Sequence, residues 1–543
     1  MKTILLFGGY GGFGGRLSAE LARRDYKILV AGRNIQKAEQ FCEKCENCVP
    51  VAADRTGDIS SVLECYQPDL IIDAAGPFQN SSDNLVQQSI AAKTAYLDLA
   101  DSRAFVCSIN RHSEAAISAG IPIISGASSV PALSGAVVRH LVSPDLKPET
   151  IDMAISASNR ATAGRSVTEA ILNYVGQPIQ LMRGGRWQIF YGWQDFCKIK
   201  FDLSNGWSAG KRSVGLADVP DLTLLVKAFH PPPAVTFRAG TELDFQNRSL
   251  WIASWLIRWK WIKSLTPLSV LLLKIQNLTR AWGSDISAMK VEIYGQENDK
   301  ACQKIWTLIA RNGDGPFIPT FAAVLLSEKI LNNQMSAGAY DAGNLLNLEE
   351  FQPLFDRCAI DHETRTILRD PSLYRRVIGP DYDHLPRRLQ NLHNSVRDAG
   401  FEGEARVETG SNIVAKIAAR LFGFPPKGTH DLHVHIQVDD RGENWTRSFS
   451  GRKFSSRLER SGQFLTERFG PFRFYFTLPV TSDGLKMQLK GWTFWRIPLP
   501  LFLAPQSTAS EWEEAGIFNF DVPITLPLFG LMVHYRGWLK PVK

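Results

Sequence analysis

Three glycines near the start of the chain have the spacing of a phosphate-binding turn. The segment 3–15 reads TILLFGGYGGFGG, and Gly9, Gly11 and Gly14 in it follow the pattern G-x-G-x-x-G. In such a turn the first glycine permits a tight bend with positive φ, the second lets the backbone approach a pyrophosphate, and the third allows close packing of helix on strand. The pattern predicts a dinucleotide site, with a glycine-rich turn that binds no nucleotide as the alternative.

The residues that follow favour the nucleotide interpretation. Phe13, Leu17 and Leu21 fall on one helical face, so the glycines connect an apolar strand to a helix. The unpaired N–H groups at the start of that helix attract a pyrophosphate, because the helix dipole favours negative charge there. We therefore expect this turn to contact the cofactor through Gly9, Gly11, Gly12, Phe13 and Gly14.

The ends of the next two strands point to a particular dinucleotide. After the strand KILVA come Gly32 and Arg33, where an NAD site has an acidic side chain for the ribose hydroxyls. An arginine suits a 2′-phosphate by its charge and its planar fork, which predicts NADP and makes NAD less favoured. A surface arginine on a turn is the alternative. Asp54, after the third strand, is expected either to accept a hydrogen bond from the adenine amino group or to cap the next helix.

Short apolar strands alternate with helical stretches up to about residue 127. After the first strand they are expected at residues 27–31, 49–53, 70–74, 96–99 and 121–124. This alternation predicts an α/β fold with a Rossmann-type doubly wound parallel sheet, whose ligands bind beyond the carboxyl ends of the strands. Further residues at those ends are expected to contact the cofactor, namely Ala75, Gly76 and Pro77.

The catalytic residues are left unassigned by the sequence. Asp98, Asp101 and Ser128 are weak candidates for a proton relay, because residues at strand ends face the cofactor in such a sheet. For each of them a role as a turn or cap residue is the alternative. No metal-ligand spacing or nucleophile–base pair stands out in the middle of the chain.

Several motifs together resemble the NADP-binding domain of saccharopine dehydrogenase-like oxidoreductases. They are GGYGGFGGRLSAELARR, LVAGRN, DAAGPF, YLDLADS, GASSVPALSG and, near residues 313–331, GDGPFIPTFAAVLLSEKIL. The resemblance implies a Rossmann domain over 1–130, an inserted mixed α/β substrate domain over 131–312 and a returning helix within 313–355. It also implies hydride transfer, while the family's range from amino-acid adducts to lipids leaves the substrate open.

The pattern changes after residue 355. Charged, proline-containing segments over 356–385 predict a linker or the lead-in to another domain. Two helical stripes follow, made of Leu385, Leu389, Leu392 and Val396 and then of Ile413, Ile417 and Leu421. From Leu432 onward residues alternate with period two, which predicts a separate α+β domain over 386–543 with an antiparallel sheet curved around the helices, a partly open barrel. This segment resembles an uncharacterised bacterial domain fused behind such reductases, and the resemblance supplies no chemistry.

The stretch from Trp251 to Leu278 mixes tryptophans with basic residues. Only ten residues separate Lys263 from Lys274, which is too short to span a bilayer. Tryptophan beside arginine and lysine suits a membrane interface, although the amphipathic pattern is poor. One interpretation of this stretch is peripheral membrane contact or a hydrophobic substrate entrance. The other is ordinary packing or a contact with another protein.

Composition and charge narrow the class of partner. The chain has 543 residues and a net charge of +7, and its basic residues are scattered among 54 acidic ones, which does not indicate a nucleic-acid partner. Its start lacks the layout of a secretory signal, so we expect a cytoplasmic protein, peripheral at the inner face of the membrane if the tryptophans dock there. The oligomeric state is not predicted.

Cysteines and histidines give weak signals for a metal. Cys42, Cys45 and Cys48 form C-x-x-C-x-x-C, but no fourth cysteine followed by proline lies nearby, so we expect a cysteine-rich helix end with reduced thiols. His433 and His435 are two apart in a predicted strand and have no third ligand, so we expect them on a solvated face. The sequence predicts no metal site.

Two functions are compatible with these residues. The first is an NADP-dependent oxidoreductase that acts on an unidentified, hydrophobic small molecule. The alternative is a protein without catalysis that holds NADP as a sensor and carries a lipid or another small ligand. The glycine turn and Arg33 fit both functions, so turnover of NADPH is what separates them.

Overall fold

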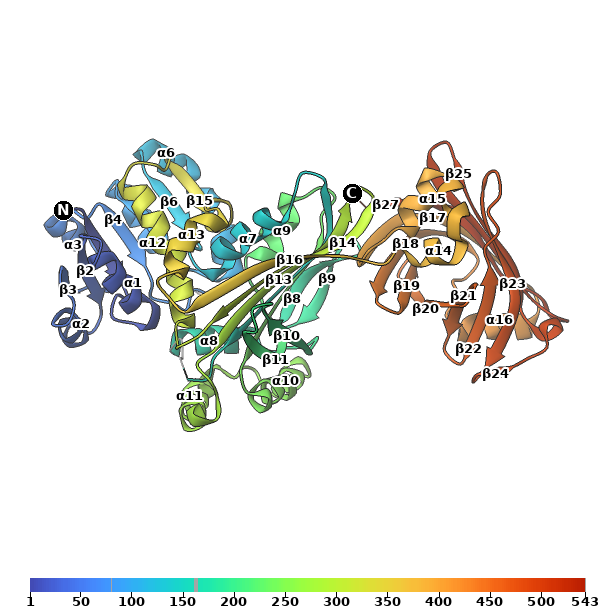
Figure 1. Cartoon of the computed structure of the whole chain (residues 1–543), viewed down its shortest axis with the longest axis horizontal. Helices are drawn as coiled ribbons and strands as arrows, with labels where there is room; N and C mark the ends of the chain where they lie inside the picture. Colours follow the sequence, from blue (N-terminus) through green and yellow to red (C-terminus); the bar gives the residue numbers. More distant parts are fainter. Residues whose placement is uncertain (80, 161–164, 543) are drawn as a thin grey trace.

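Three large β-sheets follow one another along the long axis of the computed structural model (Figure 1). The structure describes residues 1–79, 81–160 and 165–542. The N-terminal sheet is parallel, the middle sheet is mixed and the C-terminal sheet is antiparallel. This arrangement confirms the predicted α/β part, its mixed middle domain and the separate β-rich C-terminal domain.

The N-terminal sheet has the order and direction of a Rossmann-type fold. Its order is β15-β6-β5-β4-β1-β2-β3, and every pairing is parallel. The strands are β1 (Thr3–Phe7), β2 (Lys27–Gly32), β3 (Cys48–Ala52), β4 (Leu70–Asp73), β5 (Ala95–Asp98), β6 (Pro122–Ser125) and β15 (Gly338–Asp341). The helices between them are α1 (Gly12–Ala22), α2 (Ile35–Cys42), α3 (Ser60–Tyr66), α4 (Asn84–Ala91), α5 (Arg103–Cys107) and α6 (Ser113–Ala119). The sequence pattern predicts the first six strands and misses β15.

Burial on both faces explains why these strands read as continuous apolar runs. In β1 the side chains of Ile4 and Leu6 enter one core cluster, and those of Leu5 and Phe7 enter another on the opposite face. Parallel strands covered by helices on both sides have this composition. The carboxyl ends of the central strands therefore meet at one edge, where polar residues follow them.

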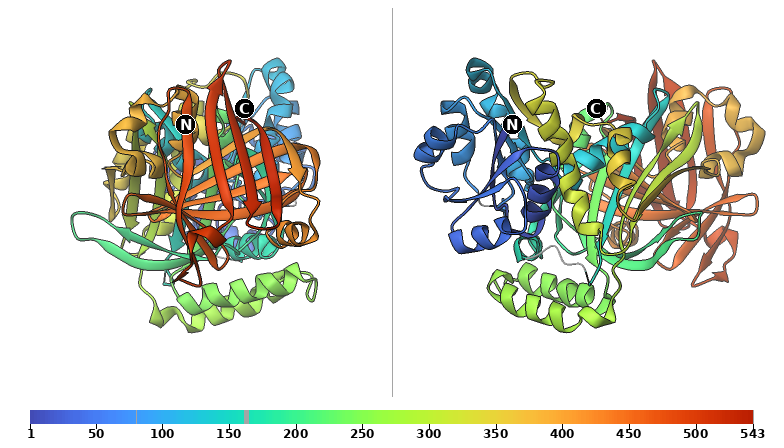
Figure 2. Two further views of the ribbon diagram at one scale, coloured as in Figure 1. Left: turned by 90° about the vertical axis from the view of Figure 1, so that its right-hand side faces the viewer. Right: turned by 60° about the vertical axis from the view of Figure 1, so that its left-hand side comes forward.

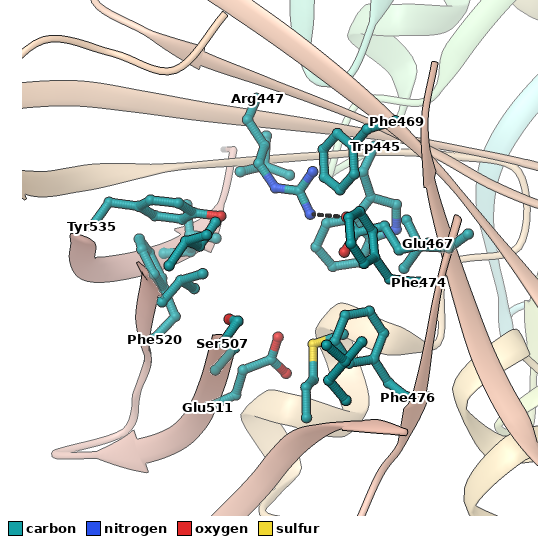
Figure 3. A pocket seen from close by; sticks show the side chains of 18 of the residues that line it. Trp445, Arg447, Glu467, Phe469, Phe474, Phe476, Ser507, Glu511, Phe520 and Tyr535 are labelled. Carbon is teal, nitrogen blue, oxygen red and sulfur yellow. Dashed lines mark hydrogen bonds and ion pairs between the residues drawn. The ribbon is translucent and has the colours of Figure 1, made fainter. Parts of the chain in front are cut away.

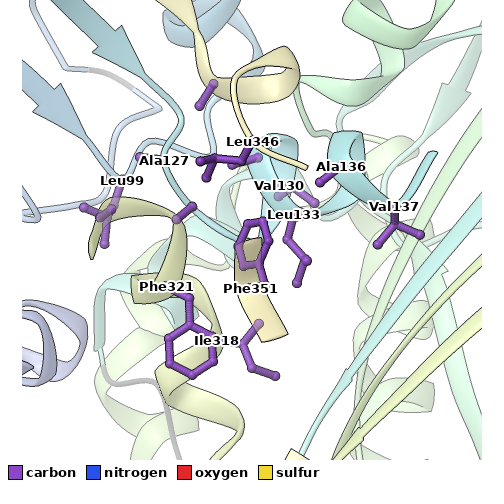
Figure 4. Packing of buried hydrophobic residues seen from close by; sticks show 14 of the residues in the cluster. Leu99, Ala127, Val130, Leu133, Ala136, Val137, Ile318, Phe321, Leu346 and Phe351 are labelled. Carbon is purple, nitrogen blue, oxygen red and sulfur yellow. The ribbon is translucent and has the colours of Figure 1, made fainter. Parts of the chain in front are cut away.

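The segment that returns from the middle domain completes this part of the molecule. Helices α12 (Ile318–Leu331) and α13 (Leu348–Phe355) pack against the residues that follow β5 and β6 (Figure 4). Leu99, Leu133 and Phe321 belong to that buried cluster. Because most of α12 is buried, it shows almost no polar face and could be identified in the sequence only through its family motif.

The middle sheet has the order β10-β11-β12-β7-β13-β14-β16. Its strands are β7 (Leu146–Ala157), β10 (Cys197–Asp202), β11 (Ser208–Leu216), β12 (Ala234–Thr241), β13 (Ser287–Glu297), β14 (Lys300–Ala310) and β16 (Ile360–Leu368). The accompanying elements are α7 (Ser134–Leu141), α8 (Arg165–Tyr174), the hairpin of β8 (Pro178–Arg183) and β9 (Arg186–Tyr191), α9 (Asp221–Ala228), α10 (Asp244–Arg258) and α11 (Ser269–Leu278). Figure 2 shows α10 and α11 side by side along one edge of the molecule.

The segment 356–385, predicted as a linker or the lead-in to another domain, is not a linker in the structure. Its first part is β16, which pairs antiparallel with β14 along the edge of the middle sheet. Its second part, α14 (Leu373–Ile378) and the turn of 3₁₀ helix Gly379–His384, packs into the core of the C-terminal domain. The charged side chains that suggest a linker are only partly exposed on this edge strand, where Asp361 accepts from Arg311, Glu363 accepts from Ser204 and Arg365 donates to the Asp202 carbonyl.

The C-terminal sheet closes into a barrel, whereas the sequence predicts a partly open one. Its strands pair in the order β22-β21-β20-β19-β18-β17-β27-β26-β25-β23, and β22 also pairs with β23. They are β17 (Asp398–Thr409), β18 (Gly428–Asp439), β19 (Gly442–Phe449), β20 (Arg452–Ser461), β21 (Phe464–Phe469), β22 (Phe472–Thr477), β23 (Gly484–Phe494), β25 (Gln506–Glu514), β26 (Ile517–Leu526) and β27 (Gly530–Pro541). The short β24 (Ile497–Pro498) extends β23 outside the ring. Closure removes the exposed edges of the sheet.

Helices lie at the two ends of this barrel. Helices α14 and α15 (Arg387–His393) lie at one end, and α16 (Ile413–Leu421) lies toward the other (Figure 1). The stripe predicted for α16 is wrong, because Ile413, Ile417 and Leu421 are 72%, 57% and 82% exposed. The small side chains of Ala415 and Ala419 are buried instead. Both sets have helical spacing, so the sequence pattern could not distinguish the buried face.

The two histidines of β18 do not lie on a solvated face as predicted. His433 is buried, and its Nε2 lies 2.8 Å from the carbonyl oxygen of Gly184 in the β8–β9 turn. His435 Nε2 lies 2.9 Å from Asp398 Oδ2, and Asp398 Oδ1 accepts a hydrogen bond from the backbone N–H of Gly184. A hairpin of the middle domain therefore covers this face of β18.

The cysteine-rich segment ends α2 and begins β3, as the sequence predicts. The expectation of reduced thiols is wrong at Cys45 and Cys48, which form a disulfide. A turn with a hydrogen bond from the N–H of Cys48 to the carbonyl of Cys45 brings the two residues together. Cys42 keeps a thiol, and burial raises its pKa.

The half-buried Glu149 joins the middle domain to the barrel. Glu149 Oε2 accepts hydrogen bonds from the backbone N–H groups of Val396 and Arg397, at 2.8 and 3.0 Å. Burial raises the pKa of Glu149 to about 7, and the nearby Asp398 adds to the shift. The protonated form is therefore favoured in the folded chain relative to the unfolded chain.

We predict that Glu149→Gln flattens the dependence of stability on pH. The raised pKa means that this group's contribution is fully present below about pH 4.5 and is lost as pH rises through about 7, a change on the order of 3 kcal/mol. The amide oxygen can accept the same two hydrogen bonds without a charge. Thermal melts between pH 5 and 8.5 should show the variant gaining on wild type as pH rises, with the exposed Glu404→Gln as control. Parallel curves for wild type and Glu149→Gln would contradict this role.

Candidate functional site

A cavity of about 420 Å³ lies beyond the carboxyl ends of the first four strands of the N-terminal sheet. The end of each strand contributes to its wall. The lining residues are Phe7, Gly8, Tyr10, Gly11, Gly32, Arg33, Ala53, Asp54, Arg55, Thr56, Ala75, Gly76, Pro77, Ser81, Ser82 and Leu85. Six of the predicted cofactor contacts are among them, namely Gly11, Arg33, Asp54, Ala75, Gly76 and Pro77.

Some glycines of the turn let α1 pack closely against β1, and Gly11 leaves room for a ligand in the cavity. Gly8, with φ of +75°, makes the bend that the sequence assigns to Gly9. A Cβ at Gly14 would overlap the carbonyl oxygen of Gly8, so α1 can pack on β1 only with glycine there. A Cβ at Gly9 would come within 2.9 Å of Ser18 Oγ, whose hydroxyl donates to the Gly9 carbonyl. Gly11 alone of the three motif glycines lines the cavity, and its Cβ would lie 3.0 Å from the Gly8 carbonyl oxygen.

The start of α1 fits a pyrophosphate group. Gly11 is the N-cap residue and has no side chain to accept from the first N–H groups of the helix. Gly12, Phe13 and Gly14 form the first turn and do not themselves line the cavity. Their backbone N–H groups are the donors that an anion at this end would use.

The adenosine end of the cavity contains Arg33 and Asp54. Arg33 is exposed at the rim, immediately after β2. Asp54 Oδ1 accepts hydrogen bonds from the backbone N–H and hydroxyl of Thr56, which lower the pKa of Asp54, and Arg33 lowers it further. Since α3 begins only at Ser60, Asp54 does not cap that helix. The expected alternative of a helix cap is therefore corrected to a local turn.

Tyr10 and Arg55 are two of the lining residues that the sequence does not predict as cofactor contacts. The ring of Tyr10 occupies the space beside Gly32 that a larger residue would need, and its hydroxyl accepts a hydrogen bond from the N–H of Asn34 at 3.4 Å. Arg55 reaches across to β4, where its Nη2 lies 3.1 Å from Oδ2 of the buried Asp73. Arg55 also donates to the Ala75 carbonyl. The sequence does show an arginine directly after Asp54 at a strand end. It does not show that this arginine pairs with Asp73, because that depends on the order of the strands in the sheet.

The three weak catalytic candidates lie outside the lining of this cavity. Asp98 is fully buried, and its Oδ1 accepts from the N–H groups of Ala100 and Gly126 and from the hydroxyl of Ser125. Burial raises its pKa to about 7, but the carboxyl serves to tie the ends of β5 and β6 together. Ser128 is also buried, with its N–H bonded to the Gly126 carbonyl.

Asp101 differs from the other two because it lies beside the middle domain. Its Oδ1 accepts a hydrogen bond from Gln79 Nε2 at 3.2 Å, two residues beyond Pro77 of the cavity wall. Burial raises the pKa of the Tyr174 hydroxyl at the end of α8, and the negative charge of Asp101 raises it further. Asp101 and Tyr174 are thus close enough for the charge of one to act on the other, neither of them lines the cavity, and the sequence does not predict Tyr174.

Known proteins are similar both to the C-terminal domain of this chain and to the part that precedes it. Residues 385–539 match the family model described as a domain of unknown function (DUF4166), which confirms that an uncharacterised domain follows the reductase-like part. No curated protein sequence matches the chain significantly.

Solved structures of dehydrogenases are similar to the remaining part of the chain. Apo saccharopine dehydrogenase (L-Glu forming) from Saccharomyces cerevisiae is 14% identical over 68% of this chain and 100% of that one, with a TM-score of 0.47. 3-Hydroxyacyl-CoA dehydrogenase type-2 from Mycobacterium avium is 12% identical over 23% of this chain and 72% of that one, with a TM-score of 0.21. An oxidoreductase of the short chain dehydrogenase/reductase family from Burkholderia thailandensis is 12% identical over 23% of this chain and 68% of that one, with a TM-score of 0.19. Likenesses of this degree assign no substrate to the chain.

We predict that Gly14→Ala destabilises the N-terminal domain strongly. The added Cβ would overlap the Gly8 carbonyl, so β1 and α1 must separate or bend. Backbone overlap of this kind costs more than about 3 kcal/mol. Gly57→Ala is the matched control, because a Cβ there meets its nearest atom at an ordinary 3.6 Å. Urea unfolding of both variants measures the difference, and equal midpoints would show that the helix does not depend on this contact.

Proposed function

We propose that this chain is an NADP-dependent oxidoreductase that transfers a hydride to or from an unidentified, hydrophobic substrate. The observation that carries the proposal is the cavity at the strand ends, with the bare backbone of Gly11 at one wall and Arg33 at the rim. Its volume suits a ligand of cofactor size, and its cations suit phosphate groups. The likeness to saccharopine dehydrogenase in the sequence motifs agrees with this reaction class.

Each residue of the cavity has a binding role in this proposal. Gly11 and the first N–H groups of α1 bind the pyrophosphate, while Gly9, Gly12, Phe13 and Gly14 keep that turn in place. Arg33 binds the 2′-phosphate, and Tyr10 and Asp54 flank the adenine. Ala75, Gly76 and Pro77 form the wall along which the dinucleotide extends.

The bound nicotinamide would supply or accept the hydride, and the chain would orient it and manage a proton. Asp101 accepts a hydrogen bond from Gln79, and its charge acts on Tyr174 of the middle domain. Asp98 is occupied by three hydrogen bonds and Ser128 is buried, so we assign them positioning roles. We propose the pair of Asp101 and Tyr174 as the place to seek the proton relay.

We predict that Arg33→Ala weakens NADPH binding and leaves NADH binding nearly unchanged. A charge-assisted hydrogen bond contributes about 1.5 to 3 kcal/mol, so the NADPH affinity should fall about tenfold to a hundredfold. Titration of the cofactor's fluorescence measures both affinities. A wild-type protein that binds NADH and NADPH equally would contradict the role of Arg33.

The contrasting variant is Gly11→Val, which should block both dinucleotides. The valine side chain fills the space that the pyrophosphate needs, whatever the ribose carries. Oxidation of NADPH with a cell extract as the source of substrate then separates the two functions. Turnover by wild type that is lost in Gly11→Val supports an oxidoreductase, whereas tight binding without turnover supports an NADP sensor.

The exposed tryptophans between Trp251 and Trp282 support a proposal of peripheral contact with a membrane. For a cytoplasmic protein this would be the inner face of the membrane. In α10 and the turn that follows it, Trp251, Trp259 and Trp261 are exposed, and Trp261 is exposed by 74%. Trp282, after α11, is exposed as well. No helix in the described part of the chain is long and apolar enough to cross a bilayer. We propose that this surface, from Trp251 to Trp282, lies in a membrane interface with Lys260 near the headgroups.

We predict that the double variant Trp259→Ser and Trp261→Ser binds vesicles about tenfold to a hundredfold more weakly than wild type. Each large side chain contributes about 1.5 to 3 kcal/mol when fully buried, and partial insertion gives about half of that. Co-sedimentation with vesicles of three parts phosphatidylcholine to one part phosphatidylserine measures the affinity. Ile189→Ser, at an exposed residue of β9, is the control. Equal sedimentation of the double variant and wild type would favour a protein contact for this surface.

A further inference from the structure

The interior of the C-terminal barrel is apolar except at a few places. Alternate residues of its strands point inward, and most of them are aromatic or aliphatic, as Phe474, Phe520 and Tyr535 are (Figure 3). Three residues that line its cavity carry charge, namely Arg447, Glu467 and Glu511, and the buried Glu443 on the same face of β19 accepts a hydrogen bond from Trp445 Nε1. A barrel filled as an ordinary core would not need buried charges, because their desolvation is costly.

The barrel also leaves space between these side chains. The volume open to the centres of water-sized molecules is about 130 Å³. A single water needs about 10 to 15 Å³ on this measure, so the space holds roughly ten non-hydrogen atoms. A cavity with apolar walls and a few convergent polar groups is the usual form of a small-molecule site.

The charged groups of the cavity already have partners. Arg447 Nη2 lies 3.5 Å from Glu467 Oε1, and its Nη1 donates to Ser456 Oγ at 2.9 Å. Glu511 Oε2 lies 2.6 Å from Nε2 of His393, which reaches in from α15. Since Glu467 already balances Arg447, the cavity offers no unmatched positive charge to a carboxylate or phosphate. The pairs can still donate to, or accept from, an uncharged polar group.

The two ends of the barrel differ. At the end covered by α14 and α15, the ring of Tyr374 stacks on His393 with centroids 3.6 Å apart, and both residues are buried. Toward the other end, Pro505 and Ser507 of the lining are partly exposed. They adjoin the exposed side chains of the 3₁₀ helix Leu501–Leu503. An apolar molecule that enters the barrel at this second end would therefore first contact the apolar side chains of Leu501–Leu503.

We propose that the barrel interior is a binding site for a slender apolar molecule of roughly ten non-hydrogen atoms with an uncharged hydrogen-bonding group, such as a medium-chain alcohol. The polar group lies against Arg447, Glu467 and Glu511, and the chain lies among the aromatic rings. This site is separate from the cavity at the glycine turn and does not depend on the cofactor proposal.

Calorimetric titration of the full chain with 1-nonanol, nonanoate and nonylammonium tests the site. We expect 1-nonanol to bind one to one and more tightly than either charged probe. Across alcohols of six to twelve carbons the affinity should rise about fourfold per methylene and stop rising when the cavity is full. Absence of one-to-one binding by every alcohol, or tightest binding by nonanoate or by nonylammonium, would overturn the proposal.

Adjacent positions of β25 provide matched variants. Ala509 is buried and lines the cavity, whereas Thr508 is exposed on the outer face. Ala509→Trp should weaken 1-nonanol binding at least tenfold, and Thr508→Trp should bind as wild type does. Val522→Phe narrows the same cavity from β26 and replaces Ala509→Trp if the latter fails to fold. Folded filling variants that bind like wild type would refute the location.

Glu467→Gln tests the charge balance. It leaves the guanidinium of Arg447 without its carboxylate partner, so nonanoate should gain at least tenfold relative to 1-nonanol. An unchanged preference would contradict the neutral-ligand assignment. Gly11→Val should bind 1-nonanol as wild type does, so failure of the cofactor site and failure of the barrel site remain distinguishable.

Discussion

The close approach of α1 to the end of β1 is the constraint on which the nucleotide site depends. Only glycine fits at position 14, since any Cβ would overlap the Gly8 carbonyl. This contact aims the start of α1 at the space beyond β1 and β4, and the N–H groups of the first turn become available there. Arg33 and Asp54 then reach the same space only because β2 lies next to β1 and β3 lies next to β2 in the sheet. The chemistry of the site thus follows from backbone packing.

The sequence predicts the parts of this fold that local patterns determine. The strands of the Rossmann part are apolar runs because they are buried on both faces, and the glycine turn has a fixed spacing. The pattern cannot predict β15 or β16, whose partners are fifty or more residues away in the chain. The same limit applies to Arg55, whose partner Asp73 is known only once β4 lies beside β1. Helical spacing likewise predicted the face of Ile413, Ile417 and Leu421 for α16, whereas packing against the barrel buries Ala415 and Ala419.

Carboxyl groups with raised pKa values illustrate the difference between structural and chemical roles. Asp98 and Glu149 both have a pKa of about 7, and burial is the main cause in each. Both accept hydrogen bonds from backbone N–H groups at the junction of two elements. A perturbed pKa alone would nominate them as catalytic, but neither lines a described cavity. The pKa of Asp101 is also raised, but the reason to consider Asp101 for catalysis is its position between Gln79 and Tyr174.

The distribution of cores shows how the two sites relate to each other. One continuous apolar cluster includes residues of both the N-terminal sheet and the middle sheet, for example Leu6, Ile151 and Val291. The barrel has a cluster of its own, and its described contacts to the middle domain through Glu149, His433 and Asp398 are polar. A shared core transmits a change of packing because close-packed interiors are stiff, whereas a few polar contacts can exchange with water. We therefore expect that occupation of the nucleotide cavity affects the middle sheet directly and that the barrel responds mainly through those polar contacts.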